Sequence, residues 1–307
     1  LFPNRIFLGT ESFPLQALDN WRAVERLPYL LGDFVWTAWD YLGESGIGHS
    51  NFDGTKAQGL KDFPWHLAWC GDLDICGHKR PQSHYRDFVW SGRTQPYLAV
   101  QHPRRFGLEE SVSAWGWPEL FESWNWTGWE GKPVRVTIYA DGDRVELFLN
   151  GNSVGSAPCG PDHRYTATFE VPYAPGALRA VAYRGETPLG EAALSTAGPA
   201  IGLRVLPETD PNTVGPDGLL YLRIEAVDAD GRRVPDARLA FRARAGEGFA
   251  LFGLGCADPQ GSQDYASDRC ALYEGRALAV LRRTEDSARA SLTLQPEGLP
   301  EAAWIQP

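Results

Sequence analysis

The spacing of hydrophobic positions predicts a strand–helix–strand unit at the start of the chain. A β-branched and aromatic run covers 5–11, and apolar residues then recur every three positions over 15–24, which is the period of one helix face. Pro28 ends that helical stripe, and a second strand-like run covers 32–40. A further helical pattern follows over 83–90. Strands that alternate with helices predict a parallel sheet.

Beyond about residue 95 the pattern changes to short runs in which apolar and polar residues alternate. This period of two is typical of strands with one buried face. Turn-forming pairs such as Asn150-Gly151 separate the runs and favour antiparallel hairpins. The runs cover 134–139, 145–149, 165–171, 178–183, 219–227, 239–245 and 277–281. They predict two successive immunoglobulin-like antiparallel β-sandwiches.

Tryptophan usage supports a division of the chain into parts of different construction. All of the 12 tryptophans except Trp304 lie at or before Trp129. We expect a strand–helix domain over 1–93, a first β-sandwich over 94–198 and a second over 199–307.

Net charge and composition exclude several classes of partner. With 307 residues, 43% hydrophobic content and 22% charged content, the chain has the make-up of a folded protein. A formal net charge of −10 leaves no basic stripe for a nucleic acid. No apolar run approaches the roughly twenty residues that a membrane-spanning helix needs. The chain begins with Leu and contains no Met, so we expect a processed product or a fragment, and a periplasmic or extracellular location stays open.

Cysteine and histidine spacing argues against a metal site. The five cysteines are Cys70, Cys76, Cys159, Cys256 and Cys270, an odd number at irregular intervals without a Cys-x-x-Cys pair. We therefore expect no disulfide framework, no zinc site and no other cofactor. Cys70 and Cys76 could still pair in an oxidising compartment.

Glu11 is the first candidate for chemistry. It ends a strand-like run and comes just before a turn and a helix. A carboxylate at the carboxyl end of a parallel strand is typical of sugar-cleaving sites in (β/α)₈ barrels, where one of two carboxyl groups attacks the anomeric carbon. The alternative is a solvated or helix-capping Glu. Regular alternation puts Glu11 on the same face as Phe7 and Gly9.

The second run carries an aromatic residue and a carboxylate that alternation places on one face. Trp36 and Asp40 share that face, and Glu44 follows in a turn within a glycine-rich loop over 43–77. An indole beside Glu11 could pack on the apolar face of a sugar ring. Trp36 could equally be a packed core residue, and Glu44 could bind either a sugar hydroxyl or its own loop.

The first part of the chain resembles glycoside hydrolase family 2, the β-galactosidase and β-glucuronidase group. The matching residues are 9–14 (GTESFP), 32–44 (GDFVWTAWDYLGE), 46–48 (GIG), 71–74 (GDLD), 79–83 (KRPQS) and 85–87 (YRD). The resemblance implies that 1–93 closes a (β/α)₈ barrel. It makes Glu11 the nucleophile on the seventh barrel strand and places Trp36 in the sugar pocket.

The resemblance continues through the rest of the chain. The matching residues are 124–126 (WNW), 131–134 (GKPV), 145–151 (VELFLNG), 228–232 (DADGR), 258–259 (DP) and 275–279 (GRALA). It covers only the back half of the family's architecture. Family members carry the acid/base Glu on the fourth barrel strand, and no such strand is present. We therefore expect this chain alone to be inactive and to act with the N-terminal part of the same enzyme on a carbohydrate substrate.

The choice of sugar depends on the segment over 70–76. Relatives that act on glucuronides read the sugar carboxylate with an Asn-x-Lys motif at this place, whereas this chain has Asp72 and Asp74. Two carboxylates would repel a uronate. A β-galactoside or a similar neutral β-glycoside is the predicted substrate of the retaining enzyme.

A second hypothesis is a non-catalytic carbohydrate-binding or scaffold protein that uses the Trp-rich first half. The clusters over 115–117 (WGW) and 124–129 (WNWTGW) could form a sugar platform, or could pack in a core or between domains. Glycan binding that survives Glu11→Gln would favour this hypothesis.

Overall fold

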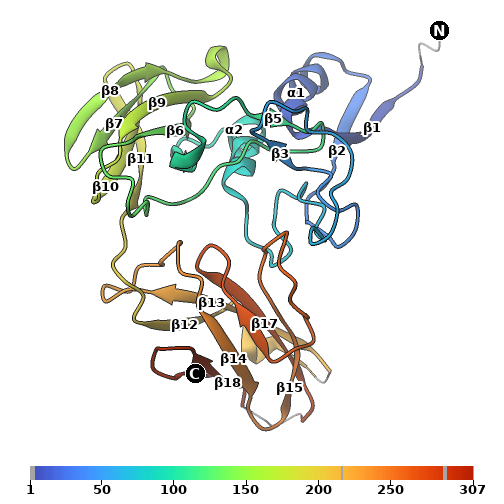
Figure 1. Ribbon diagram of the computed structural model, residues 1–307. Helices are drawn as coiled ribbons and strands as arrows, with labels where there is room; N and C mark the ends of the chain where they lie inside the picture. Colours follow the sequence, from blue (N-terminus) through green and yellow to red (C-terminus); the bar gives the residue numbers. More distant parts are fainter. Residues whose placement is uncertain (1–3, 216, 286–288, 307) are drawn as a thin grey trace. The chain divides into compact units, whose positions relative to one another are not determined.

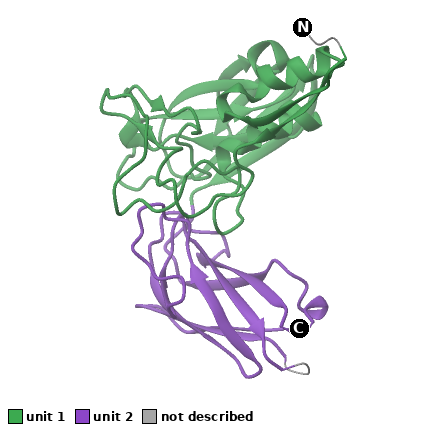
Figure 2. Ribbon diagram, turned by 90° about the vertical axis from the view of Figure 1, so that its right-hand side faces the viewer, with its two compact units in different colours: residues 1–196 green, residues 197–307 purple. Residues whose placement is uncertain are grey.

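The computed structural model describes residues 4–215, 217–285 and 289–306, and it is mostly β-structure with few helices. Contacts divide the chain into two compact units, 1–196 and 197–307, which are coloured separately in Figure 2. The three-part division expected above, with a boundary near residue 93, stays a prediction. In the described part of the chain, no helix is long and apolar enough to span a membrane.

The first unit begins with the predicted strand–helix–strand element (Figure 1). β1 (Phe7–Ser12) and β2 (Leu30–Val35) pair in parallel, and α1 (Ala17–Arg26) connects them after the 3-10 turn η1 (Pro14–Gln16). The helical stripe is therefore confirmed. Gly9 fits the narrow gap between the strands, because a Cβ there would lie 2.8 Å from Asp33 Cβ.

The second strand is shorter than its hydrophobic pattern predicted. The pattern extended it to Asp40, but β2 ends at Val35. Beyond Val35 the backbone changes partner: Thr37 N donates to Cys70 O at 3.4 Å, and Asp40 N donates to Leu73 O at 2.9 Å. The alternation of faces that grouped Trp36 with Asp40 therefore stops with the strand.

The helical pattern predicted over 83–90 is confirmed. The 3-10 turn η2 (Pro81–His84) leads into α2 (Tyr85–Ser91), and no side chain caps α2. The Ser83 hydroxyl instead donates to the carbonyls of Arg80 and Asp72, each at 2.8 Å. α2 packs against α1 through a small core that includes Leu18 and Phe88.

The rest of the first unit consists of two antiparallel sheets that share one apolar core. The first sheet has the order β4 (Tyr97–Val100), β6 (Pro133–Tyr139) and β9 (Thr166–Pro172). The second has the order β11 (Thr187–Ser195), β10 (Ala177–Arg184), β7 (Arg144–Leu149) and β8 (Asn152–Pro158). Alternate residues of β6, such as Val134, Val136 and Ile138, are buried, as the period of two predicted.

Short elements complete the first unit. They are β3 (Ser50–Asn51), β5 (Ser111–Val112), and the 3-10 turns η3 (Pro103–Arg105) and η4 (Pro161–His163). β3 pairs with β5, so the long glycine-rich loop is joined to a segment that follows β4.

The second unit also places two antiparallel sheets around one core (Figure 2). One sheet has the order β12 (Gly202–Pro207), β13 (Leu219–Val227), β17 (Arg276–Arg283) and β15 (Phe249–Gly255). The other has the order β16 (Arg269–Ala271), β14 (Ala240–Ala245), β18 (Ser291–Pro296) and β19 (Ala302–Ile305), and the 3-10 turn η5 (Pro211–Thr213) follows β12. The alternating runs predicted over 219–227, 239–245 and 277–281 are therefore strands.

Candidate functional site

Glu11 lies near the carboxyl end of β1, where the pairing with β2 is irregular. Gly9 pairs with Asp33 and Ser12 pairs with Val35, so three steps along β1 match two steps along β2. The extra residue on β1 forms a bulge at this end of the strand. Bulges often occur beside functional sites, where they re-aim a side chain.

The bulge interrupts the regular alternation on which the face assignment of Glu11 was based, and that assignment stays a prediction. A one-residue change of register moves the following side chains to the other face, so a count from Phe7 does not carry through to Glu11. Ser12 is buried, and its hydroxyl donates to Phe34 O at 3.3 Å, which anchors the chain directly after Glu11. Glu11 itself is exposed.

An arc of aromatic rings is built onto the residues that flank Glu11. Trp36 N donates to Ser12 O at 3.5 Å, so the indole begins where the two parallel strands end. The Trp36 ring lies edge to face with Trp115, at 6.3 Å between centroids, and Trp115 lies edge to face with Phe13 at 4.5 Å. Trp36 remains 38% exposed, which leaves part of its ring open to a ligand.

Tyr41 and Glu44 continue this arc. Trp36 Nε1 donates to the Tyr41 hydroxyl at 3.2 Å, and that hydroxyl donates to Glu44 Oε2. Burial, together with the hydrogen bond to Glu44, raises the pKa of Tyr41, so the phenol stays protonated and keeps its donor role. Glu44 is exposed, and the structure therefore adds one carboxylate to the polar end of the arc.

Asp40 is buried beside Cys70 and is not one of the exposed residues of the arc. Its side chain is only 3% exposed, and Oδ1 accepts a hydrogen bond from Cys70 N at 3.3 Å. Burial raises the pKa of Asp40, and the nearby Arg80 guanidinium opposes that rise. Arg80 is also buried, and it donates to Trp69 O at 2.9 Å and Gly71 O at 3.2 Å. This position suits a group that holds the loops in place.

Backbone pairing with a distant segment holds the loop that carries Glu44. Gly43 N donates to His66 O at 3.0 Å and Gly46 N donates to Leu67 O at 2.8 Å. On its other side, the loop joins β5 through β3, and Ser113 N donates to His49 O at 3.1 Å. Trp115 comes shortly after β5, so the pairing of β3 with β5 brings it to Trp36.

Asp72 and Asp74 are not the free charges on which the choice of sugar was based. Asp72 Oδ2 pairs with Arg86 Nε at 2.7 Å, and its Oδ1 accepts from Trp117 Nε1 at 3.0 Å. Asp74 Oδ1 accepts from the backbone amides of Cys76 and His78, at 2.9 and 3.0 Å. Asp72 therefore has a cationic partner, and Asp74 is held by the backbone of its own loop, while their repulsion of a uronate stays a prediction.

The two tryptophans of the 115–117 motif have different surroundings. Trp117 is buried against α2 and bonded to Asp72, as packing predicted. Trp115 is part of the aromatic arc, a role that the sequence pattern left open between packing and a sugar platform. Its position in a Trp-Gly-Trp motif after a loop was the only local signal.

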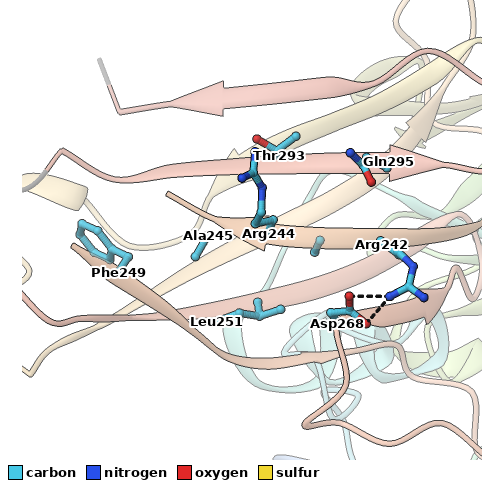
Figure 3. A pocket seen from close by; sticks show the side chains of 9 residues that line it. Arg242, Arg244, Ala245, Phe249, Leu251, Asp268, Thr293 and Gln295 are labelled. Carbon is cyan, nitrogen blue, oxygen red and sulfur yellow. Dashed lines mark hydrogen bonds and ion pairs between the residues drawn. The ribbon is translucent and has the colours of Figure 1, made fainter. Parts of the chain in front are cut away.

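The second unit has a separate cavity of about 380 Å³, which holds none of the predicted site residues. Figure 3 shows it between β14, β15 and β18, with Phe249 and Leu251 on one side and Thr293 and Gln295 on the other. Asp268 at its edge is already paired with Arg242, at 2.6 and 2.8 Å. Glu11 and Trp36, the main predicted site residues, both lie in the first unit.

Comparison with family models assigns two segments of the chain. Residues 203–304 match glycoside hydrolase family 2 C-terminal domain 5, and residues 131–189 match a domain of unknown function, DUF4982. Both matches lie in the strand-rich part that follows the arc.

Individual relatives cover almost all of the chain. It is 25% identical over 287 residues to β-galactosidase BoGH2A of Bacteroides ovatus. The aligned segment covers 92% of this chain and 29% of that protein. The structure superposes with a TM-score of 0.88 on a crystallised glycosyl hydrolase family 2 member from Bacteroides cellulosilyticus, at 34% identity over 99% of this chain and 39% of that one. A β-glucuronidase of the same family shares the fold, with a TM-score of 0.68 at 16% identity over 95% of this chain and 27% of that one. The chain thus spans between about a quarter and two fifths of the length of these relatives.

Proposed function

The chain belongs to glycoside hydrolase family 2, and we propose that it is the C-terminal part of a retaining β-glycosidase in which Glu11 is the nucleophile. The observation that carries this proposal is an exposed carboxylate at a bulged strand end, flanked by the backbone that holds Trp36 and Phe13. In this mechanism Glu11 attacks the anomeric carbon and forms a glycosyl-enzyme, which water then hydrolyses.

The aromatic arc supplies the sugar-binding surface in this proposal. The open part of the Trp36 ring packs on the apolar face of the sugar, and Trp115 and Tyr41 hold that ring in place from two sides. In this proposal Glu44 accepts a hydrogen bond from a sugar hydroxyl, which its exposure supports. Asp40, which strand alternation placed on the substrate side with Trp36, acts in this proposal through the loops that it holds.

We assign a neutral β-glycoside, such as a terminal β-galactoside, as the substrate. The support is the charge of Glu44 at the polar end of the arc, because an exposed carboxylate disfavours a sugar that carries its own carboxylate. The parent enzyme is the longer protein of which this chain is proposed to be the C-terminal part. If it hydrolyses an aryl β-glucuronide in preference to an aryl β-galactoside, this assignment is contradicted.

We further propose that 1–93 closes a (β/α)₈ barrel and that 94–198 and 199–307 are β-sandwich domains, the last one immunoglobulin-like. Parallel pairing of β1 and β2 across α1 supports the barrel assignment. The two-stranded sheet also exposes large apolar side chains, among them Leu31 at 71% and Phe34 at 61%. Covering each of them with further strands would contribute about 1.5–3 kcal/mol.

The isolated chain is expected not to turn over an aryl β-galactoside. Two parallel strands are too few for independent stability, and the acid/base carboxylate that the family resemblance implies comes from another part of the enzyme. Full activity of the 307-residue chain by itself would contradict this part of the proposal.

A mechanism-based fluoro-sugar tests the nucleophile directly. Incubated with the parent enzyme and followed by peptide mass spectrometry, it should label Glu11, and Glu11→Gln should abolish the labelling. Glu25→Gln is the matched control, because Glu25 is an exposed carboxylate on α1. This variant should be labelled at Glu11 to the same extent as the wild type. Labelling of a different Glu would refute the assignment of Glu11.

The same variants separate the enzyme from a non-catalytic glycan-binding protein. The observation that favours the second possibility is that the arc of Trp36 and Trp115 can bind a sugar ring without any catalytic carboxylate. Two results together would favour the binding protein. Glu11→Gln would still bind a β-galactoside resin, and the wild-type protein would show neither turnover nor labelling.

A further inference from the structure

Two buried cysteines of the second unit come from different sheets and meet in the core. Cys256 follows β15 directly, and Cys270 lies in β16, which belongs to the opposite sheet. Their side chains are only 4% and 5% exposed, and both belong to the apolar core of this unit. Strands β15 and β16 approach each other at this point.

One carboxamide contacts both thiols. Gln263 Oε1 accepts from Cys270 Sγ at 3.1 Å and from Cys256 Sγ at 3.6 Å, and its Nε2 donates to Cys256 Sγ at 3.4 Å. The Cys270 thiol also hydrogen-bonds to Cys256. The two sulfur atoms therefore already lie in contact, at a buried site that solvent hardly reaches.

The surroundings of Cys256 differ from those of the other buried thiols. The hydrogen bond from Cys270 lowers the pKa of Cys256, against the effect of burial. At Cys159, by contrast, burial raises the thiol pKa to about 11, and at Cys70 it raises the pKa to about 12. Since the thiolate is the form that attacks a disulfide, Cys256 is the better nucleophile of these.

We propose that Cys256 and Cys270 form a disulfide that joins the two sheets of the second unit. The oxidant is a disulfide-bearing molecule, either a small one such as oxidised glutathione or an oxidised dithiol protein. The Cys256 thiolate attacks one sulfur of that disulfide and releases one thiol, and the Cys270 thiolate then displaces the second thiol from the mixed disulfide. Two protein thiols and one external disulfide become one protein disulfide and two external thiols.

The bond would close the loop over 256–270, which contains Gln263. It forms during local opening of this loop, which admits the oxidant while Cys270 still lies beside Cys256. The sulfurs must approach to about 2 Å, while their hydrogen bonds to Gln263 are lost. Closing the loop restricts the unfolded chain, so the bond is expected to stabilise the second unit.

Peptide mapping tests the proposal. The chain is folded with oxidised glutathione, alkylated in denaturant without reductant, and digested with trypsin. Cleavage after Arg244, Arg269 and Arg276 puts Cys256 in the peptide 245–269 and Cys270 in the peptide 270–276. We expect these two peptides as one linked species that a reductant separates. The peptide 145–164, which carries Cys159, is the internal control and should be alkylated.

Two results of the mapping would overturn the proposal. One is alkylation of both Cys256 and Cys270 in the oxidised sample. The other is linkage of either cysteine to Cys70, Cys76 or Cys159. Because the mapping uses the wild-type chain, it does not depend on whether a variant folds.

Thermal unfolding gives an independent measurement. Reductant should lower the Tm of the second unit by about 5–15 °C in the wild type and in Cys159→Ser, since closing a loop of this size contributes on the order of 3 kcal/mol. In Cys256→Ser and Cys270→Ser, reductant should leave the Tm unchanged. An equal Tm of the wild type with and without reductant would contradict the stabilising bond.

Discussion

Trp36 and Trp115 lie edge to face at 6.3 Å between ring centroids, although one follows the second strand and the other lies in a loop beyond β5. The contact exists because β3 pairs with β5 and so joins the glycine-rich loop to the segment that carries Trp115. The proposed sugar surface is therefore assembled from both the strand–helix part and the loops that follow it.

Removal of the Trp115 ring should weaken the parent enzyme without abolishing its chemistry. An aromatic pair contributes about 0.5–1.5 kcal/mol beyond its buried area, so Trp115→Ala should lower kcat/KM by roughly 3- to 10-fold through a less ordered Trp36. Steady-state kinetics on an aryl β-galactoside measure this effect. Phe252→Ala, which removes an exposed ring of the second unit, is the control and should leave kcat/KM unchanged.

Gly71→Ala should destabilise the loops that pack around Asp40. A Cβ at Gly71 would lie 2.3 Å from Leu73 O and 2.4 Å from Asp40 N, and both atoms belong to the backbone. Overpacking of this kind costs about 1–3 kcal/mol of unfolding free energy, measured by urea denaturation. At Gly202 no atom lies within 4 Å of the added Cβ, so Gly202→Ala should cost clearly less, and equal losses would contradict the steric argument.

The buried pair of Asp72 and Arg86 should matter far more than an exposed pair of the same type. Arg86→Met leaves a buried carboxylate without its partner, which costs about 3–5 kcal/mol of unfolding free energy. Arg164→Met breaks the exposed pair with Asp19 and should cost less than about 1 kcal/mol. Denaturant unfolding of both variants measures the difference, and similar losses would contradict the burial argument.

Asp40 should give stability an unusual pH dependence for a carboxyl group. Burial raises its pKa in the folded state, so the folded protein binds this proton more tightly than the unfolded chain does. The contribution of Asp40 to stability is therefore fully present below its unfolded pKa of about 3.9, and is lost as the pH rises through the folded pKa.

The variant Asp40→Asn isolates this contribution. The unfolding free energy of the wild type, relative to Asp40→Asn, should fall as the pH rises from about 4 towards neutrality. Asp53→Asn is a control of opposite sign, because hydrogen bonds from Thr55 lower the pKa of the exposed Asp53. A wild-type curve parallel to that of Asp40→Asn would show that the pKa of Asp40 is not raised.

The amino-acid sequence by itself determined the local elements and the family. The three-residue period over 15–24 predicted α1, and the alternation over 134–139 predicted β6, because each pattern reports which face of one element is buried. The motif around Glu11 indicated family 2, since it preserves contiguous residues that do not depend on the rest of the fold.

Only the tertiary structure decided which distant groups meet. It ended β2 at Val35, brought Trp115 to Trp36, neutralised Asp72 with Arg86 and placed Cys256 against Cys270. A local pattern shows that a polar or aromatic group needs a partner, but the partner is set by how loops close in space. For this reason the sequence predicted a carboxylate at a strand end, while the surroundings of that carboxylate came from residues of several other segments.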